Sequence, residues 1–158
     1  MSTTTIRPAP VRKSIVVKAD AAHAFEVFTA RISNWWPRSH SVGASPQTSV
    51  VMEPRSGGRW YEIGQDGSQC NWGKVLAFEP PSRLLLAWQI SGDWKYDPDL
   101  VTEVEVKFTS LGGGETRVEL EHRNIDRHGE GWGWMREAVD SEGGWPLYLR
   151  RFAELFEA

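Results

Sequence analysis

Turn residues and strand-length segments alternate between Pro54 and Trp88, in the order Gly57-Gly58-Arg59-Trp60-Tyr61-Glu62, Trp72-Gly73-Lys74-Val75, Glu79-Pro80-Pro81-Ser82-Arg83-Leu84 and Ala87-Trp88. Glycine and proline favour tight turns, and the segments between them have the length of single strands. Tryptophans recur in these segments, and rings of this size predict an aromatic-lined interior. The stretch therefore predicts consecutive antiparallel strands that curl around a cavity.

Alternation between apolar and polar residues extends this sheet in both directions. In the segment 100–110, Val104, Val106 and Phe108 share one face and charged residues occupy the other, which is typical of a sheet with one dry and one wet face. Turns are expected at 65–67, 79–82 and 112–114. Seven strands are expected in all, at residues 11–18, 48–53, 58–63, 69–78, 83–91, 100–110 and 115–123.

Two amphipathic helices accompany the strands. The first is expected over 21–32, capped by Asp20, and Asn34-Trp35-Trp36-Pro37 ends it or adds a short turn. The second is expected after Ser141, with a length of about 14 residues from the 3.6-residue period of its apolar positions. Its apolar stripe consists of Trp145, Leu149, Phe152 and Phe156, and the dry face of the sheet is the large partner available to cover it. The segment 126–140, between the last expected strand and the second helix, is either a short helix or a lid-like segment.

Composition narrows the classes of protein to which this sequence can belong. The 158 residues are 40% hydrophobic, which suits a single domain over 11–158 that follows a flexible tail at 1–10. The 18 basic and 21 acidic residues are well mixed, and this argues against nucleic acid as a partner. No apolar run reaches the length of a membrane span, and the single cysteine, Cys70, indicates a reducing compartment. A cytoplasmic protein is expected, with neither cofactor nor metal, because His23, His40 and His128 lack ligand spacing.

The chain contains the motifs Phe25-x-x-Phe28, Trp35-Trp36-Pro37, Gly57-Gly58-Arg59-Trp60, Trp72-Gly73-Lys74-Val75-Leu76, Pro80-Pro81-x-Arg83-Leu84, Ala87-Trp88 and Gly143-Gly144-Trp145-Pro146. Together they resemble motifs of the START-like (SRPBCC, helix-grip) superfamily, and in particular of bacterial relatives of the C-terminal domain of the activator of heat-shock protein 90 ATPase. The resemblance covers about 11–156. It implies an α+β fold in which a curved seven-strand antiparallel sheet wraps a long C-terminal helix, with one or two short helices after the first strand. It also implies an apolar tunnel that binds lipids, hormones or polyketides in some members and hosts cyclisation or hydrolysis in others.

Glu62 is the sharpest candidate for chemistry. Residues two apart on a strand share a face, so Glu62 points inward if Trp60 does. A carboxylate among tryptophans is costly to bury unless it is paired or protonated, and such groups are enriched at functional sites. The alternative is a glutamate on the wet face, which a bulge near Gly57-Gly58 would also produce.

His122 is the second polar candidate. It follows Val118 and Leu120 on the predicted dry face, where it either contacts a ligand or acts as a base, or else bonds to local backbone. The pattern around Lys74 is mixed and leaves its direction open.

These residues and the resemblance together leave three functions open. The first is a protein that binds a small hydrophobic or aromatic molecule. The second is an enzyme of the polyketide cyclase or hydrolase type, with Glu62 and His122 as acid and base candidates. The third, a module that contacts a chaperone or another partner, follows from the resemblance alone. The expected ligand-binding residues are Trp60, Glu62, Trp72, Trp88, His122, Trp145, Leu149 and Phe152.

Overall fold

The computed structural model describes residues 10–36, 47–91 and 95–156, so nearly all of the tail expected at 1–10 lies outside the described residues. Seven antiparallel strands form one sheet in the order β1-β7-β6-β5-β4-β3-β2, which confirms the predicted sheet. The strands are β1 (Val11–Val17), β2 (Gln47–Met52), β3 (Arg59–Gly64), β4 (Gln69–Glu79), β5 (Arg83–Trp88), β6 (Thr102–Gly112) and β7 (Glu115–Arg123).

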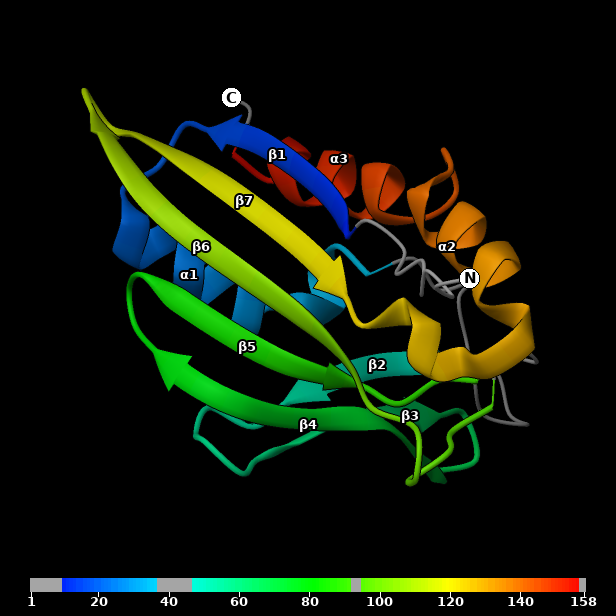
Figure 1. Ribbon diagram of the computed structural model, residues 1–158. Helices are drawn as coiled ribbons and strands as arrows, with labels where there is room; N and C mark the ends of the chain where they lie inside the picture. The colour runs from blue at the N-terminus through cyan, green and yellow to red at the C-terminus, as the bar shows by residue number, and fades with distance from the viewer. Residues whose placement is uncertain (1–9, 37–46, 92–94, 157–158) are drawn as a thin grey trace, which may run out of the picture.

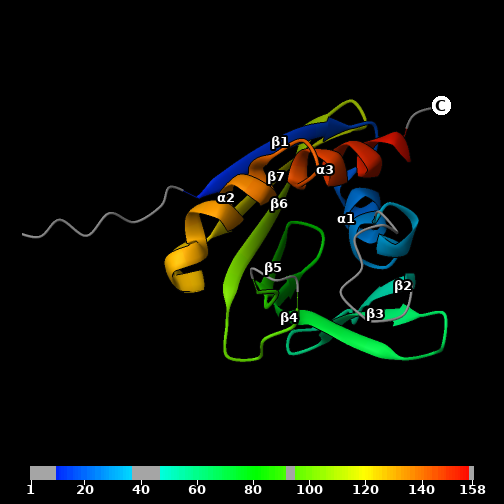
Figure 2. The same cartoon turned by 90° about the vertical axis from the view of Figure 1, so that its right-hand side faces the viewer.

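The sheet curls around the helices on one side. Figure 1 looks onto its outer face, with α1 (Ala21–Thr29) and α3 (Trp145–Glu154) behind the strands. Figure 2 shows the same elements from the side, where both helices lie within the curve. α1 contacts β6 and β7, whereas α3 contacts β1. The α+β helix-grip architecture expected from the sequence is therefore confirmed.

The first helix is shorter than predicted. Asp20 caps it as expected, because its carboxylate accepts a hydrogen bond from the backbone N–H of His23 at 2.8 Å. The helix ends at Thr29, whose hydroxyl donates to the carbonyl of Phe25 at 2.8 Å, and a separate 3-10 turn, η1 (Ile32–Asn34), follows. The predicted helix over 21–32 is thus two elements, and Trp35 and Trp36 leave the second one directly into the core, where they are 1% and 2% exposed.

The chain between β7 and α3 is helical. η2 (Ile125–Gly131) and α2 (Trp132–Asp140) occupy it, so the short-helix alternative is right and the segment is not a structureless lid. α3 has 10 residues, fewer than the predicted 14, and begins at Trp145 with Pro146 in its first turn. No helix in the described ranges is long and apolar enough to cross a membrane.

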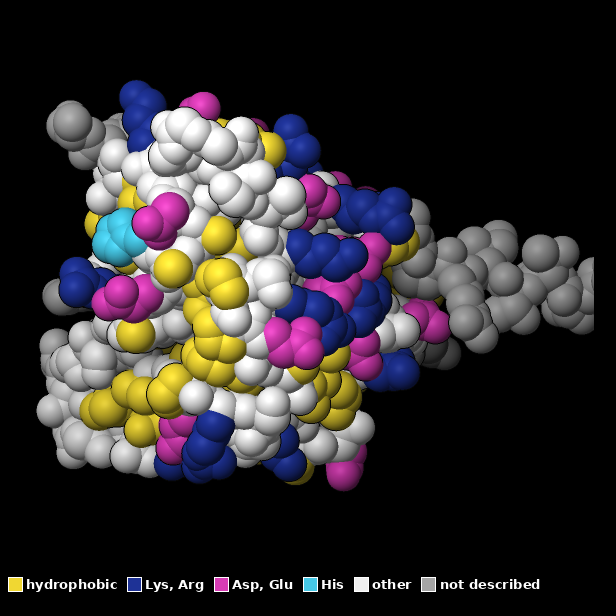
Figure 3. Space-filling model, turned by 90° about the vertical axis from the view of Figure 1, so that its left-hand side faces the viewer, with side chains coloured by type: hydrophobic (Ala, Val, Ile, Leu, Met, Phe, Trp, Pro, Cys, Tyr) yellow, Lys and Arg dark blue, Asp and Glu magenta, His cyan; other side chains and the backbone are white. Residues whose placement is uncertain are grey.

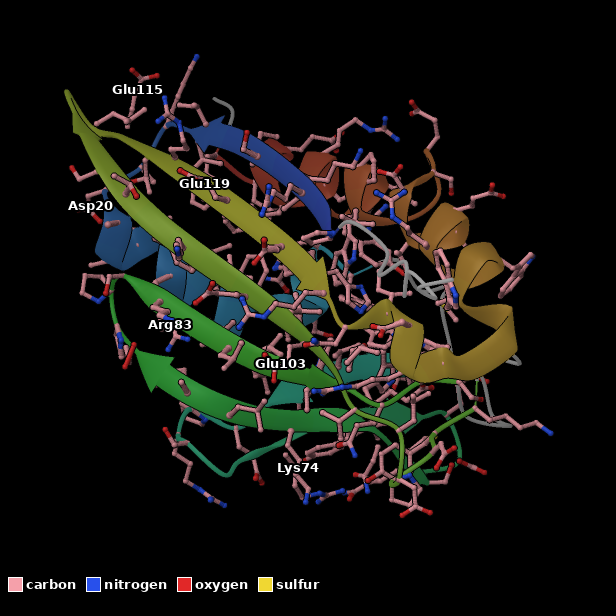
Figure 4. The ribbon with its side chains drawn as sticks, in the orientation of Figure 1. Asp20, Lys74, Arg83, Glu103, Glu115 and Glu119 are labelled. Atoms are coloured by element: carbon pink, nitrogen blue, oxygen red, sulfur yellow. The ribbon has the colours of Figure 1, made fainter. Side chains whose placement is uncertain are left out.

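The outer face of the sheet carries mixed charge. Arg123 on β7 donates hydrogen bonds to Glu103, Glu105 and Glu121 at 3.0 to 3.1 Å, and Arg83 on β5 contacts Glu105 at 2.6 Å. Partial burial opposes ionisation of Glu105, but the hydrogen bonds from the two guanidinium groups outweigh it and lower its pKa. Figure 4 labels Arg83 and Glu103 on this face, and Figure 3, seen from the left-hand side of Figure 1, shows basic and acidic side chains interspersed towards the right of the view. This charged network lies on the solvent-exposed face of the sheet that the sequence predicts.

Candidate ligand site on the inner face of the sheet

β3 carries the two residues on which the site is centred. Trp60 and Glu62 are 0% and 1% exposed, whereas Arg59 between the turn and Trp60 is exposed. The pairing of Glu62 with Val50 on β2 and with Cys70 on β4 keeps both edges of β3 hydrogen-bonded at this point. Of the two orientations that the sequence left open, Glu62 therefore has the inward one.

The carboxylate of Glu62 is held by an indole. The Nε1–H of Trp72 donates to its Oε1 at 3.0 Å inside the protein. A hydrogen bond to a carboxylate is shorter and stronger than a neutral one, and it offsets part of the cost of burying the group. Across the strand pair, burial raises the pKa of the half-buried Cys70 thiol, and the charge of Glu62 raises it further. Glu62 is thus a fixed acceptor in an aromatic environment.

A β-bulge in β4 explains how Trp72 reaches Glu62. The pairing passes from Trp60 with Gly73 to Tyr61 with Asn71, which leaves Trp72 as the extra residue on β4. An inserted residue interrupts the two-residue alternation, so Trp72 and Gly73 are both buried while Lys74 is exposed. Figure 4 shows Lys74 projecting from the outer side of β4. The mixed pattern that left Lys74 undecided in the sequence is the signature of this bulge.

Five tryptophans form what we call the indole cluster: Trp36, Trp60, Trp72, Trp88 and Trp145. The rings of Trp60, Trp72 and Trp88 lie 5.8 to 5.9 Å apart, centroid to centroid. Trp36 packs edge-on against Trp72 at 4.8 Å, and Trp145 packs against Trp88 at 5.5 Å. Offset and edge-to-face arrangements at these distances are the favoured geometries of aromatic pairs. Residues from β3, β4, β5, α3 and the end of η1 therefore meet in one aromatic wall.

His122 is built into the same wall through both ring nitrogens. Trp145 Nε1–H donates to Nδ1 at 3.1 Å, so the proton of the neutral ring is on Nε2, which lies 2.8 Å from the hydroxyl of Thr102. Thr102 donates in turn to the carbonyl of Trp88 at 3.2 Å. The ring is fully buried, and this burial lowers its pKa to about 3, with a smaller contribution from His128. At neutral pH His122 is an uncharged link between β6, β7 and α3.

This buried ring predicts a loss of stability in acid. In the unfolded chain His122 takes a proton near its ordinary pKa of 6.5, but in the folded protein it stays neutral down to about 3. The unfolded state binds more protons in that window, so the free energy of unfolding falls as the pH falls from about 6.5 towards 3. One proton corresponds to about 1.4 kcal/mol per pH unit.

Urea unfolding at several pH values in this window measures the effect. The parent should lose stability more steeply than His122→Gln, by about 1.4 kcal/mol per pH unit, because all other titrating groups are common to both proteins. Parallel stability curves would show that His122 is not buried in its neutral form.

Phe152 and Leu149 are both buried, at 0% and 3% exposure. The ring of Phe152 packs against Phe156 at 5.1 Å, Phe28 at 5.3 Å and Trp35 at 5.7 Å, none of which belongs to the indole cluster. Phe152 thus contacts the rings of α1 and the segment after η1. Of the residues predicted for the site, Trp60, Glu62, Trp72, Trp88, His122 and Trp145 lie together.

Three residues of the site were not among the sequence candidates. Trp36 contacts Trp60, Trp72, Trp145 and Tyr148, with its ring only 4.5 Å from that of Tyr148. Tyr148 follows Trp145 by three residues on α3, a spacing that places both on one helix face and could have revealed it. Thr102 was predicted in a strand, but its partner His122 lies 20 residues away, so local patterns gave no signal for the bond.

A groove reaches the cluster from the surface. It has a volume of about 540 Å³ and is lined by Ser33, Asn34, Trp36, Arg151 and Leu155. Arg151 is fixed beside it by a hydrogen bond from its Nε to the carbonyl of Trp35 at 2.8 Å. Trp36 lies between this groove and the interior rings. The segment 38–47 is rich in serine, glycine and proline, which predicts a loop at the entrance to the site, and it lies outside the described residues except for Gln47 at its end.

The described ranges contain no cluster of side chains that would form a metal site. No three His, Cys, Asp or Glu side chains lie close enough there to hold a metal ion. What the inner face offers instead is one carboxylate, several indole N–H groups and a set of aromatic surfaces. These groups suit the binding of an aromatic molecule through stacking and a few oriented hydrogen bonds.

Comparisons with known proteins agree with this geometry. The model of the family described as activator of Hsp90 ATPase homolog 1-like protein matches residues 18–157. The structure of Txn09, an anthrahydroquino-γ-pyrone synthase complexed with SUM, is similar at 42% identity and a TM-score of 0.66, and the match covers 94% of this chain and 97% of that one. CalC from Micromonospora echinospora, a self-sacrificing resistance protein, is similar at 34% identity and a TM-score of 0.69, with 93% of each chain covered.

A third structure shows the same fold at low identity. The Aha1 dimer from Colwellia psychrerythraea is 14% identical with a TM-score of 0.62, over 95% of this chain and 97% of that one. No curated protein matches the sequence. Since the family model spans most of the chain and the sheet has the expected helix-grip form, the protein belongs to the family of activator of Hsp90 ATPase homolog 1-like proteins.

Proposed function

We propose that this protein binds a small aromatic molecule on the inner face of its sheet, against the indole cluster and beside Glu62. The observation that carries the proposal is the buried Glu62 carboxylate, 1% exposed and bonded to Trp72 at 3.0 Å. A carboxylate contributes little to a purely structural core, because its desolvation costs more than an apolar residue would. Among aromatic surfaces it is an acceptor suited to orienting a ligand hydroxyl.

Two similar proteins support a ligand of this kind. Txn09 is a synthase of an anthrahydroquino-γ-pyrone, which is a polycyclic aromatic compound, and it shares 42% of its residues with this chain. CalC, at 34% identity, is a self-sacrificing resistance protein, so proteins of this fold include both a synthase and a resistance protein. We place the protein in the cytoplasm, where the thiol of Cys70 stays reduced. A contact with a chaperone has support in the family description alone.

The second candidate is an enzyme of the polyketide cyclase type in the same site, favoured by the similarity to a synthase. Ring closure needs a group that takes a proton from an acidic carbon or hydroxyl. His122 is a poor base at neutral pH, because its pKa is about 3 and its Nδ1 already accepts from Trp145. Glu62 is therefore the residue on which the enzymatic alternative depends.

Binding is tested with Glu62→Gln and a matched control. Quenching of tryptophan fluorescence by 2,6-dihydroxyanthraquinone should give a dissociation constant at least about tenfold weaker for Glu62→Gln, because a hydrogen bond to a charged group contributes about 1.5–3 kcal/mol. Glu119→Gln makes the same change on the outer face of β7 and should bind like the parent (Figure 4).

Two outcomes count against the proposal. If neither this probe nor anthracene binds the parent, and mass spectrometry of the purified protein finds no aromatic molecule bound, the protein is not a receptor for this ligand class. If both variants bind like the parent, Glu62 does not contact the ligand. Turnover of the bound probe or of a co-purified molecule, lost in Glu62→Gln, would support the enzymatic alternative.

A further inference from the structure

We propose that Trp60 and Trp88 donate hydrogen bonds to the ligand, which therefore carries carbonyl oxygens on its aromatic frame, as a quinone does. This inference rests on the proposed function and names the ligand class for the same site. It goes further because it assigns the ligand's acceptors to two particular indole nitrogens.

The inference begins from two buried donors. The Nε1 atoms of Trp60 and Trp88 have no hydrogen-bond acceptor among the residues that the structure describes, although the two side chains are 0% and 1% exposed. A buried polar group without a partner costs about 1–3 kcal/mol, and such groups are rare in folded proteins. The two rings lie 5.9 Å apart, centroid to centroid, and we assign the missing acceptor of both donors to a bound ligand.

The neighbouring tryptophans show that this is not a general property of the cluster. The indole N–H groups of Trp35, Trp72 and Trp145 donate to the carbonyl of Val27, the carboxylate of Glu62 and the ring of His122, respectively. The fold thus provides acceptors for the indoles that it uses structurally.

Two polar side chains beside the two donors are already engaged. The His122 ring lies 5.4 Å from that of Trp88, but its Nδ1 accepts from Trp145 and its Nε2 carries the proton that faces Thr102. The Glu62 carboxylate shares the inner face of β3 with Trp60, yet the indole that it binds is Trp72. A ligand oxygen can therefore satisfy Trp60 and Trp88 without displacing an existing hydrogen bond of these groups.

The surroundings select a neutral carbonyl among possible acceptors. A ligand carboxylate would bring a second acid group next to Glu62. Two ionised carboxyl groups that share one site repel each other, so this arrangement is disfavoured. A hydrocarbon would leave both indole N–H groups without a partner. A planar ring system with carbonyl oxygens supplies the acceptors and also an aromatic face for the rings of Trp72 and Trp145.

Anthraquinone and anthracene separate these possibilities, because they share the same three rings and differ in the two carbonyl groups. Equilibrium dialysis of the parent should show tighter binding of anthraquinone, by on the order of tenfold. Trp60→Phe and Trp88→Phe keep an aromatic ring but remove the N–H, and each should reduce this preference about fivefold. Trp35→Phe is the control, since its N–H is bonded to Val27, and it should keep the parent's preference.

A second measurement uses the unmodified protein, so it does not depend on the folding of the variants. In a nitrogen-15 NMR spectrum of the indole groups, the Nε1–H signals of Trp60 and Trp88 should move downfield with anthraquinone and not with anthracene. Equal affinity for the two compounds with no such movement would overturn the inference while the proposed function stands. If neither compound binds, the inference fails, and the proposed function fails with it if 2,6-dihydroxyanthraquinone is also not bound and no aromatic molecule co-purifies.

Discussion

Phe152→Ala should lower the free energy of unfolding by about 3–5 kcal/mol, the range for a large aromatic residue truncated in a core. The side chain is 0% exposed and lies within 5.3 to 5.7 Å, ring to ring, of Phe28 and Trp35. Alanine would leave a cavity between α3 and the end of α1 that neither helix can close without moving from the sheet. Urea denaturation at pH 7 measures the change, provided that the slope with denaturant is the same in both proteins.

Leu155→Ala is the matched control on the same helix end, because Leu155 is 44% exposed. It should change stability by no more than about 0.5 kcal/mol, as surface substitutions do. Both variants introduce alanine at the end of α3, at a buried and at an exposed position, so the comparison shows the effect of side-chain burial. A loss below about 1 kcal/mol for Phe152→Ala would mean that α3 does not rest on α1 as described.

The number and order of the strands could be predicted because their signals are local. Glycine and proline mark each hairpin, and the alternation in β6 and β7 assigns one face to the core without reference to any other segment. The bulge at Trp72 breaks that alternation for a reason that lies in the neighbouring strands, namely the change of pairing between Trp60 and Tyr61. Sequence period alone therefore left the direction of Lys74 undecided.

The same contrast between local signals and contacts of distant segments decides which residues of the site could be predicted. Trp60 and Glu62 could be placed together because two residues on one strand share a face. Trp36 could not, because its direction depends on α1 ending at Thr29 and on the 3-10 turn that follows. The partners of His122 come from β6 and α3, and such contacts between distant segments leave no periodic trace in the sequence.

Gly73→Ala is the second substitution with a large expected effect. A Cβ atom added to Gly73 would lie 1.7 Å from the carbonyl oxygen of Ala87 on β5 and 2.9 Å from its carbonyl carbon. Both contacts are with backbone, which cannot rotate away as a flexible side chain does. β4 and β5 must separate to admit the methyl group, at a cost at or above the upper end of the usual range for overpacking, about 3 kcal/mol. Thermal or urea unfolding should show this loss directly.

Gly133→Ala is the control for this change, since nothing lies within 4 Å of the Cβ it would add and the residue is in helix α2. It should leave stability unchanged or raise it by up to about 1 kcal/mol, because alanine favours a helix over glycine. Gly73→Ala should also disturb the site, because Gly73 follows the bulged Trp72, whose carbonyl accepts from Gln89 at 2.9 Å and whose indole holds Glu62. We therefore expect the indole NMR signal of Trp72 to shift or broaden in Gly73→Ala and to stay in place in Gly133→Ala. An unchanged Trp72 signal together with parent-like stability would show that β4 and β5 are farther apart than this packing requires.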